Sequence, residues 1–209
     1  IIDIKREKIY KSYLSLEITL TLSNVIRNIL NILENKDIRL LSIDLDNTCW
    51  TGVIGEDGIN NIFLDIYQKK SLKNIDELIN KTGLLLSIHS KNDENLAFKG
   101  IKKYFSKYKN LISKSFKYIN WDSKTISIKK ISKLVNFSKK NIVYLDDNIS
   151  EIKQINKFLS KNNCFWIKNS YLFYLYTKCI YLSNIRKEKN LNRFKEIKSN
   201  ISRSEITDN

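Results

Sequence analysis

The sequence predicts an α/β fold in which a Rossmann-like parallel sheet carries helices on both faces. From residue 38 onward, short apolar runs alternate with longer amphipathic stretches, a pattern typical of βαβ units. Acidic, amide and hydroxyl side chains directly follow the apolar runs. Because parallel sheets bind their ligands at the carboxyl ends of the strands, this second pattern predicts a functional site at that edge.

Five apolar runs predict the strands, and the stretches between them predict the helices. The strands are expected at residues 39–43, 84–88, 116–119, 142–145 and 164–167. The helices between them are expected at about residues 69–82, 93–106, 123–137 and 150–160. An earlier helix is expected after Ser23, which has the chemistry of an N-cap.

We expect three parts along the chain. Residues 1–37 form an N-terminal helical segment or linker, residues 38–183 a catalytic domain, and residues 184–209 a basic helical extension. The extension is either a solvated helix or a contact for an acidic partner protein. The sequence contains no methionine, even at position 1, so we expect a domain of a longer polypeptide.

Charge and cysteine content narrow the classes of function. The 209 residues include 37 Lys and Arg against 22 Asp and Glu, a formal net charge of +15. This charge suits a polyanionic partner or reflects lysines spread over a solvated surface. The lysines are scattered and arginines are few, so no nucleic-acid partner is expected.

The three cysteines have no CxxC spacing, which argues against a disulfide framework or a zinc site and favours a reducing, cytoplasmic setting. No apolar run reaches the roughly 18 residues that a membrane-spanning helix needs. We therefore expect no membrane association.

The first acid pair is Asp44 and Asp46, which follow the first predicted strand. Strand alternation puts both carboxylates on one side of the chain, with Leu45 pointing away. Two carboxylates this close repel each other and favour a bound cation. One can attack phosphorus while the other gives and takes a proton. The alternative is that both are ordinary residues at a strand end.

Further polar residues follow the other strands. Ser90 can hold a phosphate oxygen, although Ser90 or Asn92 can equally cap the next helix. Lys124 can neutralise a phosphoryl group, although a single lysine in this lysine-rich chain is weak support. Asp146 and Asp147 leave a buried strand together, which is costly unless the charges are paired or bound to a metal. Two acidic clusters on one sheet edge predict a Mg²⁺ site.

The order of acid pair, hydroxyl, lysine and acid pair resembles the haloacid dehalogenase superfamily of phosphatases and phosphotransferases, over residues 38–168. The resemblance implies that Asp44 is the nucleophile and Asp46 the general acid and base. It implies phosphate binding by Ser90, Lys91, Asn92 and Lys124, with Lys124 also stabilising the transferring group. Mg²⁺ would be held by Asp44, the main chain at Asp46, and Asp146, with Asp147, Asn148 and Trp50 in support.

A narrower resemblance is to the FkbH-like branch, through residues 44–58, Ser90-Lys91-Asn92-Asp93, Asn120-Trp121 and Asp146-Asp147-Asn148. Members of this branch resemble glyceryl transferase/phosphatases of polyketide biosynthesis. The resemblance implies that 1,3-bisphosphoglycerate supplies a glyceryl unit, that its phosphate is removed, and that an acyl carrier protein accepts the unit. The alternative is a phosphatase that acts on a free small phosphorylated metabolite.

Cys49 lies three residues after Asp46. By the resemblance, its thiolate accepts the acyl group as a thioester, with a neighbouring cation lowering its pKa. The alternative is a buried, packed thiol. Gly52, Gly55 and Gly58 predict a short, tight flap after strand one, and the sequence leaves no room for a large cap. Trp50 and Trp121 are expected to line the site or pack in the core, and His89, Cys164 and Cys179 to pack.

Overall fold

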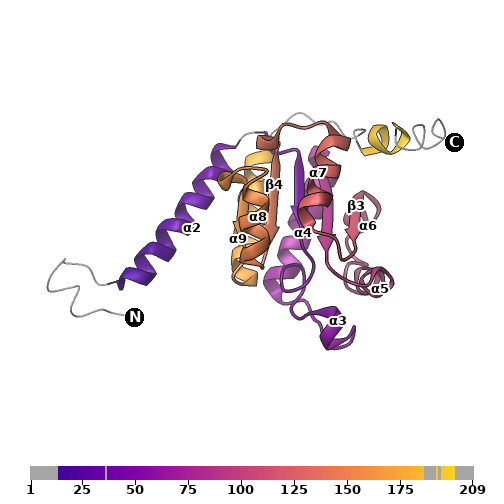
Figure 1. Cartoon of the computed structure of the whole chain (residues 1–209), viewed down its shortest axis with the longest axis horizontal. Coiled ribbons are helices and arrows are strands. Elements are labelled where there is room, and N and C mark those ends of the chain that lie inside the picture. The colour runs from indigo at the N-terminus through magenta and orange to yellow at the C-terminus, as the bar shows by residue number, and fades with distance from the viewer. Residues whose placement is uncertain (1–13, 36, 186–191, 193, 201–209) are drawn as a thin grey trace.

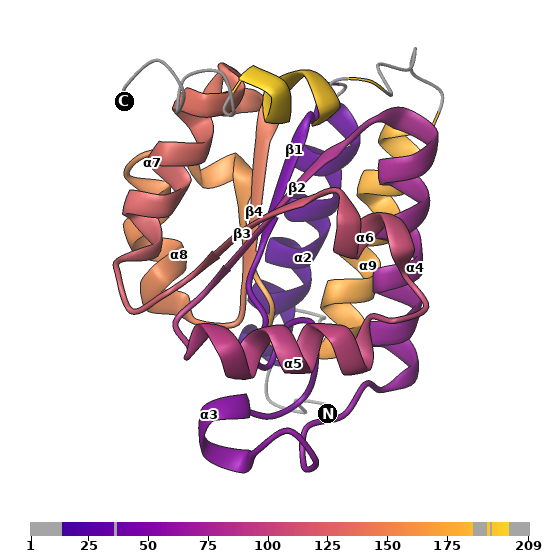
Figure 2. The same cartoon turned by 90° about the vertical axis from the view of Figure 1, so that its right-hand side faces the viewer.

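The predicted α/β fold is confirmed by the computed structural model, which describes residues 14–35, 37–185, 192 and 194–200. Five parallel strands form one sheet in the order β3-β2-β1-β4-β5 (Figures 1 and 2). The strands are β1 Leu40–Ile43, β2 Leu85–Ser90, β3 Ser115–Ile119, β4 Ile142–Asp146 and β5 Cys164–Trp166. Each therefore falls within one or two residues of an apolar run that predicted it.

Helices cover both faces of the sheet. The α-helices are α2 Leu16–Glu34, α3 Ile54–Asp57, α4 Ile66–Thr82, α5 Glu94–Tyr104, α6 Lys109–Ser113, α7 Lys124–Val135, α8 Ile149–Asn156 and α9 Ser170–Asn184. Two short 3₁₀ turns, η1 Lys139–Asn141 and η2 Lys161–Asn163, precede β4 and β5. Figure 2 shows α7 and α8 on one face and α4 and α9 on the other.

Period-two alternation in the strands builds a separate apolar layer on each face. Leu41 and Ile43 of β1 pack in the layer that contains the buried residues of α4 and α9. Leu40 of β1 and Ile142 of β4 pack in the layer that contains those of α7 and α8. Since both faces are buried, every residue of β1, β2 and β4 is buried. This is why these strands appear in the sequence as apolar runs.

Side-chain caps fix where the helices begin. The Asp65 side chain accepts from the backbone N–H of Gln68, and the Gln68 side chain accepts in return, forming a capping box at the start of α4. The Asp93 and Asn169 side chains cap α5 and α9 by accepting from the backbone N–H groups of Leu96 and Leu172. The predicted cap at Ser23 is wrong. α2 starts one residue after Ser15, and the Ser23 hydroxyl donates to Thr19 O inside the helix.

Parts of the two flanking segments pack on the domain. Asn28 of α2 donates to the Tyr176 hydroxyl of α9 at 3.0 Å, and Figure 1 shows the start of α2 extending away from the body. In the C-terminal extension, residues 185–189 lie almost wholly outside the described residues. Residues 194–200 are helical, Ile197 is buried, and the Phe194 ring lies 5.1 Å from that of Phe116. This part of the extension is therefore packed on the domain, whereas a solvated helix was one expectation for it.

A short flap follows β1, as expected. It holds α3 and an antiparallel bridge between Thr51 and Phe63. Gly52 and Gly58 adopt positive φ angles of 101° and 78°, which a glycine accommodates without a steric penalty. Between Ser90 and Lys124 the chain forms only α5, α6 and β3, so no large cap covers the sheet edge there. No helix among the described residues is both long and apolar enough to cross a membrane.

Replacing Gly52 by alanine is expected to destabilise the protein by about 1–3 kcal/mol, because a positive φ and a steric clash coincide. A Cβ at Gly52 would lie 2.8 Å from the Asp57 Oδ2 atom and 3.0 Å from the Ile62 Cγ2 atom. Urea unfolding measures the loss. Gly58→Ala is the matched control, because Gly58 has a positive φ with nothing within 4 Å. Equal losses in the two variants would contradict the steric argument.

Candidate active site

The strand order brings the predicted site residues to one edge of the sheet. β1 lies between β2 and β4. Asp44 directly follows β1, Ser90 ends β2 and Asp146 ends β4. Lys124 is the first residue of α7, which follows β3. Four segments that are distant in sequence therefore bring these residues to the same edge of the sheet.

Three carboxylates and one ammonium group form the centre of the site. The Lys124 Nζ atom lies 2.9 Å from Asp44 Oδ1 and 2.8 Å from Asp146 Oδ2. Asp44, Asp146 and Asp147 each place an oxygen within 4.8 Å of the others. Asp44, Asp146 and Lys124 are buried. The three aspartates are referred to below as the carboxylate cluster.

Burial and mutual repulsion change the acidity of this cluster. Burial is the main cause that raises the pKa of Asp44 well above its usual range, the Asp146 charge adds to it, and Lys124 opposes it. Burial, then Asp146, raises the pKa of Asp147 to about 6. Burial alone would lower the pKa of Lys124, but the charges of Asp44 and Asp146 raise it above its usual value. The single ammonium therefore compensates only part of the negative charge.

The predicted supporting residue Asn148 and two hydroxyl residues that were not predicted, Thr48 and Tyr144, complete the cluster. The Thr48 hydroxyl accepts from the Asp147 N–H at 3.1 Å, and the Asn148 N–H donates to Asp146 Oδ1 at 2.7 Å. The Tyr144 hydroxyl hydrogen-bonds to Asp146 Oδ2. Strand alternation places Tyr144 on the same side of β4 as Asp146, a signal that the sequence already contained.

The Asp46 carboxylate lies outside the carboxylate cluster, contrary to the expectation from strand alternation. Its Oδ1 accepts from Trp50 Nε1 at 2.8 Å and from the Ile54 N–H at 3.2 Å. Its Oδ2 accepts from Asn92 Nδ2 at 2.9 Å. The chain leaves the extended conformation after β1, since the Cys49 N–H donates to Leu45 O at 2.8 Å. This turn directs Asp46 to the flap, so only its main chain remains a candidate metal ligand.

The three predicted phosphate-binding residues after β2 do not stay together. Ser90 and Asn92 are buried, and Asn92 Nδ2 lies 2.8 Å from Ser90 Oγ. Lys91 was expected to join them, but its side chain lies apart from these two residues. It is exposed, and its Nζ pairs instead with Glu151 Oε1 at 2.7 Å. Glu151 is buried on α8, so the Lys91 ammonium is the ionic partner of a buried acid, and its role in phosphate binding stays a prediction.

Cys49 does not have the surroundings that an acyl-accepting thiolate requires. It is fully buried, and its Sγ donates to the main-chain oxygen of Asp44 at 3.0 Å. Burial, followed by the charges of Asp44 and Asp46, raises the pKa of the thiol well above its usual value. The expectation of a lowered pKa is wrong, because the charged groups that act on the thiol are carboxylates. These surroundings are those of a packed, inert cysteine.

In the native protein, Cys49 is expected to react with iodoacetamide at least roughly 10²-fold more slowly than after unfolding in urea, because alkylation requires an opening of the core. Peptide mass spectrometry of timed samples measures labelling at Cys49. The same protein in urea serves as the control for reagent activity. Complete labelling of native Cys49 at the rate seen in urea would contradict its burial.

The aromatic residues and the histidine differ in role. Trp50 is buried, with its ring 5.6 Å from Phe105, and it also contacts Asp46, so it serves both the core and the site. Trp121 is 73% exposed and is not packed in the core. His89 is buried, stacks on Tyr118 and has a pKa lowered by burial to about 3. It is therefore a neutral packing residue, as expected. Cys164 and Cys179 are also buried.

Three solved structures share this fold. The N-terminal part of protein BF1531 from Bacteroides fragilis, which contains a phosphatase domain and is complexed with Mg, is 24% identical, with a TM-score of 0.55. The alignment covers 90% of this chain and 50% of that one, so the present chain spans half the length of that match. No protein-family model matches the sequence, and neither does any curated protein.

The other two structures match over most of their own length. A Vibrio cholerae protein assigned as a 3-deoxy-D-manno-octulosonate 8-phosphate phosphatase is 16% identical with a TM-score of 0.52, covering 75% of this chain and 91% of that one. A Pseudomonas syringae pv. phaseolica protein assigned to the YrbI family of phosphatases is 13% identical with a TM-score of 0.54, covering 74% and 92%. The chain thus has the fold of these phosphatase structures.

Proposed function

We propose that this protein is a Mg²⁺-dependent phosphatase of the haloacid dehalogenase type. The observation that carries the proposal is the meeting of Asp44, Asp146, Asp147 and Lys124 at the carboxyl edge of the sheet. A nucleophilic carboxylate, a further acid pair and a lysine are the groups that phosphoryl transfer through an aspartyl phosphate needs. The shared fold with solved phosphatase structures supports the same conclusion.

The carboxylate cluster fits Mg²⁺. Its three members offer oxygen ligands close together, and Mg²⁺ prefers such hard oxygen donors. A neighbour of the same fold was crystallised with Mg. Asp44, Asp146 and Asp147 would hold the ion, with the main chain at Asp46 as a further ligand. When bound, the ion neutralises the cluster and polarises a phosphoryl oxygen.

Separate side chains of the protein carry out the steps of the proposed reaction. The Asp44 carboxylate attacks phosphorus, and the bond between phosphorus and the leaving oxygen breaks. Asp46, held in orientation by Trp50, Ile54 and Asn92, donates a proton to that oxygen and later takes one from the water that hydrolyses the aspartyl phosphate. Lys124 and Ser90 stabilise the charge on the phosphoryl oxygens.

Hydrolysis of p-nitrophenyl phosphate tests the proposal directly. The purified chain should release p-nitrophenol with Mg²⁺, and excess EDTA should stop the release. Isothermal titration with Mg²⁺ alone shows whether the cluster binds the ion. Binding of Mg²⁺ without hydrolysis of p-nitrophenyl phosphate or acetyl phosphate would overturn the enzymatic assignment.

The glyceryl-loading reaction is the second candidate. The FkbH-like motif over residues 44–58 supports it, as does the lack of a large cap over the described sheet edge, which leaves room for a carrier-bound arm. The burial of Cys49 opposes its thioester step, because the thiol must become accessible for the acyl group to reach it. Incubation with 1,3-bisphosphoglycerate, Mg²⁺ and acyl carrier protein, followed by intact-mass measurement of the carrier, tests it. A carrier mass gain that Cys49→Ala abolishes supports this route, and no mass gain rejects it.

Mg²⁺ is expected to stabilise the protein more strongly as the pH rises from about 4 to 7. Asp147 has a folded-state pKa raised to about 6 from the usual 3.8, so its proton stabilises the metal-free fold below pH 4. That contribution is lost as the pH rises through 6, while Mg²⁺ binds the deprotonated cluster. Thermal melts with Mg²⁺ or EDTA at each pH measure the difference. A difference in melting temperature that does not change with pH would contradict this linkage.

A further inference from the structure

Asp46, the proposed general acid and base, accepts hydrogen bonds from two different parts of the protein. Trp50 Nε1 and the Ile54 N–H donate to its Oδ1 at 2.8 and 3.2 Å, and Asn92 Nδ2 donates to its Oδ2 at 2.9 Å. Trp50 and Ile54 belong to the same loop as Asp46, so they hold it within the flap. Asn92 follows β2. It is therefore the donor, among the described residues, that fixes Asp46 relative to the sheet edge.

The Asn92 amide has no hydrogen left to donate to a phosphate. Its NH₂ group carries two hydrogens. One is donated to Asp46 Oδ2 and the other to Ser90 Oγ, at 2.9 and 2.8 Å. The side chain is 3% exposed, and a Cβ added to Gly55 of the flap would lie 3.6 Å from its Oδ1 atom. The remaining polar atom, Oδ1, is an acceptor and does not bind an anion.

The same amide prepares the Ser90 hydroxyl for a phosphate. Because Ser90 Oγ accepts from Asn92, its own hydrogen is directed elsewhere, and the hydroxyl has no other hydrogen bond among the described residues. That hydrogen is available to a phosphoryl oxygen. Since one amide nitrogen joins Asp46 to Ser90, the group that gives a proton and the group that binds phosphate keep a fixed separation.

The donors also indicate which oxygen of Asp46 carries the proton. A carboxylate oxygen has about two positions that accept a hydrogen. Both positions of Oδ1 are taken, by Trp50 and Ile54, whereas Oδ2 accepts from Asn92 alone among the described residues. Oδ2 therefore has the free position for a proton, and Asn92 is the residue that holds this atom.

We propose that Asn92 is a positioning residue for acid–base catalysis and not a ligand of the phosphate. It holds Asp46 Oδ2 beside the ester oxygen of a phosphate bound at Ser90. As the bond between phosphorus and that oxygen breaks, the proton passes from Oδ2 to the oxygen. Oδ2 later takes a proton from the water that hydrolyses the aspartyl phosphate. The proposal rests on the proposed phosphatase function, and it replaces the expectation that Asn92 binds phosphate.

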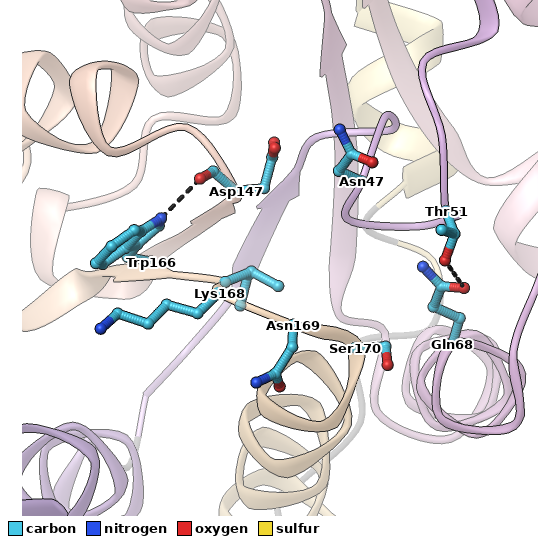
Figure 3. Close-up of a pocket in the computed structure, with 9 residues that line it drawn as sticks. Asn47, Thr51, Gln68, Asp147, Trp166, Lys168, Asn169 and Ser170 are labelled. Carbon is cyan, nitrogen blue, oxygen red and sulfur yellow. Dashed lines mark hydrogen bonds between the residues drawn. The ribbon is translucent and has the colours of Figure 1, made fainter. Parts of the chain in front are cut away.

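Two aryl phosphates with different leaving groups test this role. Phenolate is a stronger base than p-nitrophenolate, so its departure depends more on protonation by Asp46. A cavity of about 700 Å³ adjoins the carboxylate cluster, lined by Asp147 and by Asn47, the residue after Asp46. Figure 3 shows Thr51 across this cavity from Asp147. Both aryl groups fit a space of this size, so a difference between them reports chemistry rather than steric fit.

Asn92→Leu keeps the size of the side chain and removes both donated hydrogen bonds. With Mg²⁺, kcat/KM should fall about tenfold for p-nitrophenyl phosphate and about 100- to 1,000-fold for phenyl phosphate, because the second ester needs the acid more. Asp46→Asn should change the ratio of the two values in the same direction. Ser90→Ala is the matched control. It removes a phosphate contact that both esters share, so it should lower both values by the same factor.

Thermal melts show which variants are folded. Asn92→Ala also removes the amide, and it replaces Asn92→Leu in the comparison if the leucine variant does not fold. Equal losses for the two esters in a folded Asn92 variant would refute the positioning role, since a phosphate ligand gives that result, while wild-type turnover keeps the phosphatase assignment. If the wild-type protein hydrolyses neither ester, both proposals fail.

Discussion

Replacing Asp44 by asparagine is expected to abolish phosphatase turnover while leaving the metal-free protein folded. An amide does not attack phosphorus to form the acyl phosphate intermediate, so kcat should fall by at least about 10³-fold. The fold should persist because the substitution removes one negative charge from a buried cluster in which burial and Asp146 already raise the pKa of Asp44. Lys124 keeps its pair with Asp146 at 2.8 Å.

Two measurements check this expectation together. Turnover of p-nitrophenyl phosphate gives the loss in kcat, and thermal unfolding in EDTA gives the stability. The folded-state pKa of Asp44 is raised, so the native state loses stability as the pH rises through that pKa. Asp44→Asn removes the titrating group, so the stability of the variant should fall less steeply with rising pH. Glu94→Gln, an exposed carboxyl-to-amide change on α5, is the matched control. Turnover within tenfold of wild type would exclude Asp44 as the nucleophile.

The sheet could be predicted from the sequence because buried parallel strands are apolar on both faces. α9 was not predicted, and the reason is physical. It packs in the same apolar layer as α4, with Phe173, Tyr176 and Ile180 buried, so apolar residues occupy much of its surface. A helix of this kind lacks the amphipathic period that identified α4, α5, α7 and α8. The bounds of the domain and of its two extensions stay predictions.

The candidate site was predictable as a set of strand ends but not as a set of side-chain directions. Asp44, Lys124 and Asp146 meet because the strand order brings their segments to one edge of the sheet, where Ser90 also ends the neighbouring strand β2. Asp46 and Cys49 point elsewhere because the chain turns after Leu45, with Asn47 at a φ of 51°. Strand alternation therefore ceased to apply one residue before Asp46. The Lys91 side chain pairs with Glu151, which lies 60 positions later in the chain. No local sequence pattern indicates a contact over that separation.

Replacing Lys124 by methionine is expected to have the largest effect on stability. Methionine keeps the length of the side chain but leaves the buried Asp44 and Asp146 carboxylates without their shared cation. Removing one partner of a buried ion pair costs about 3–5 kcal/mol. Turnover should also fall by about 10²–10³-fold, because Lys124 is a donor to the transferring group in the proposed mechanism.

Mg²⁺ provides a second cation for the same carboxylates, so it should recover part of the stability lost in Lys124→Met without recovering turnover. Unfolding in urea with EDTA and with Mg²⁺ measures this recovery. Lys130→Met controls for the loss of an exposed lysine from α7. If Lys124→Met lowers the free energy of unfolding in EDTA by less than about 1 kcal/mol, the carboxylates take up protons when the lysine is lost, and the stability of the fold does not depend on Lys124.

The double variant Asp44→Asn with Lys124→Met separates charge balance from chemistry. If Lys124 stabilises the fold by compensating the Asp44 charge, the double variant should be more stable in EDTA than Lys124→Met alone. The coupling between two groups 2.9 Å apart should reach about 0.5–3 kcal/mol. Turnover should stay as low as in Asp44→Asn, because both substitutions remove groups that act in one step and their kinetic effects do not add. Strict additivity in stability would show instead that Lys124 acts through Asp146 alone.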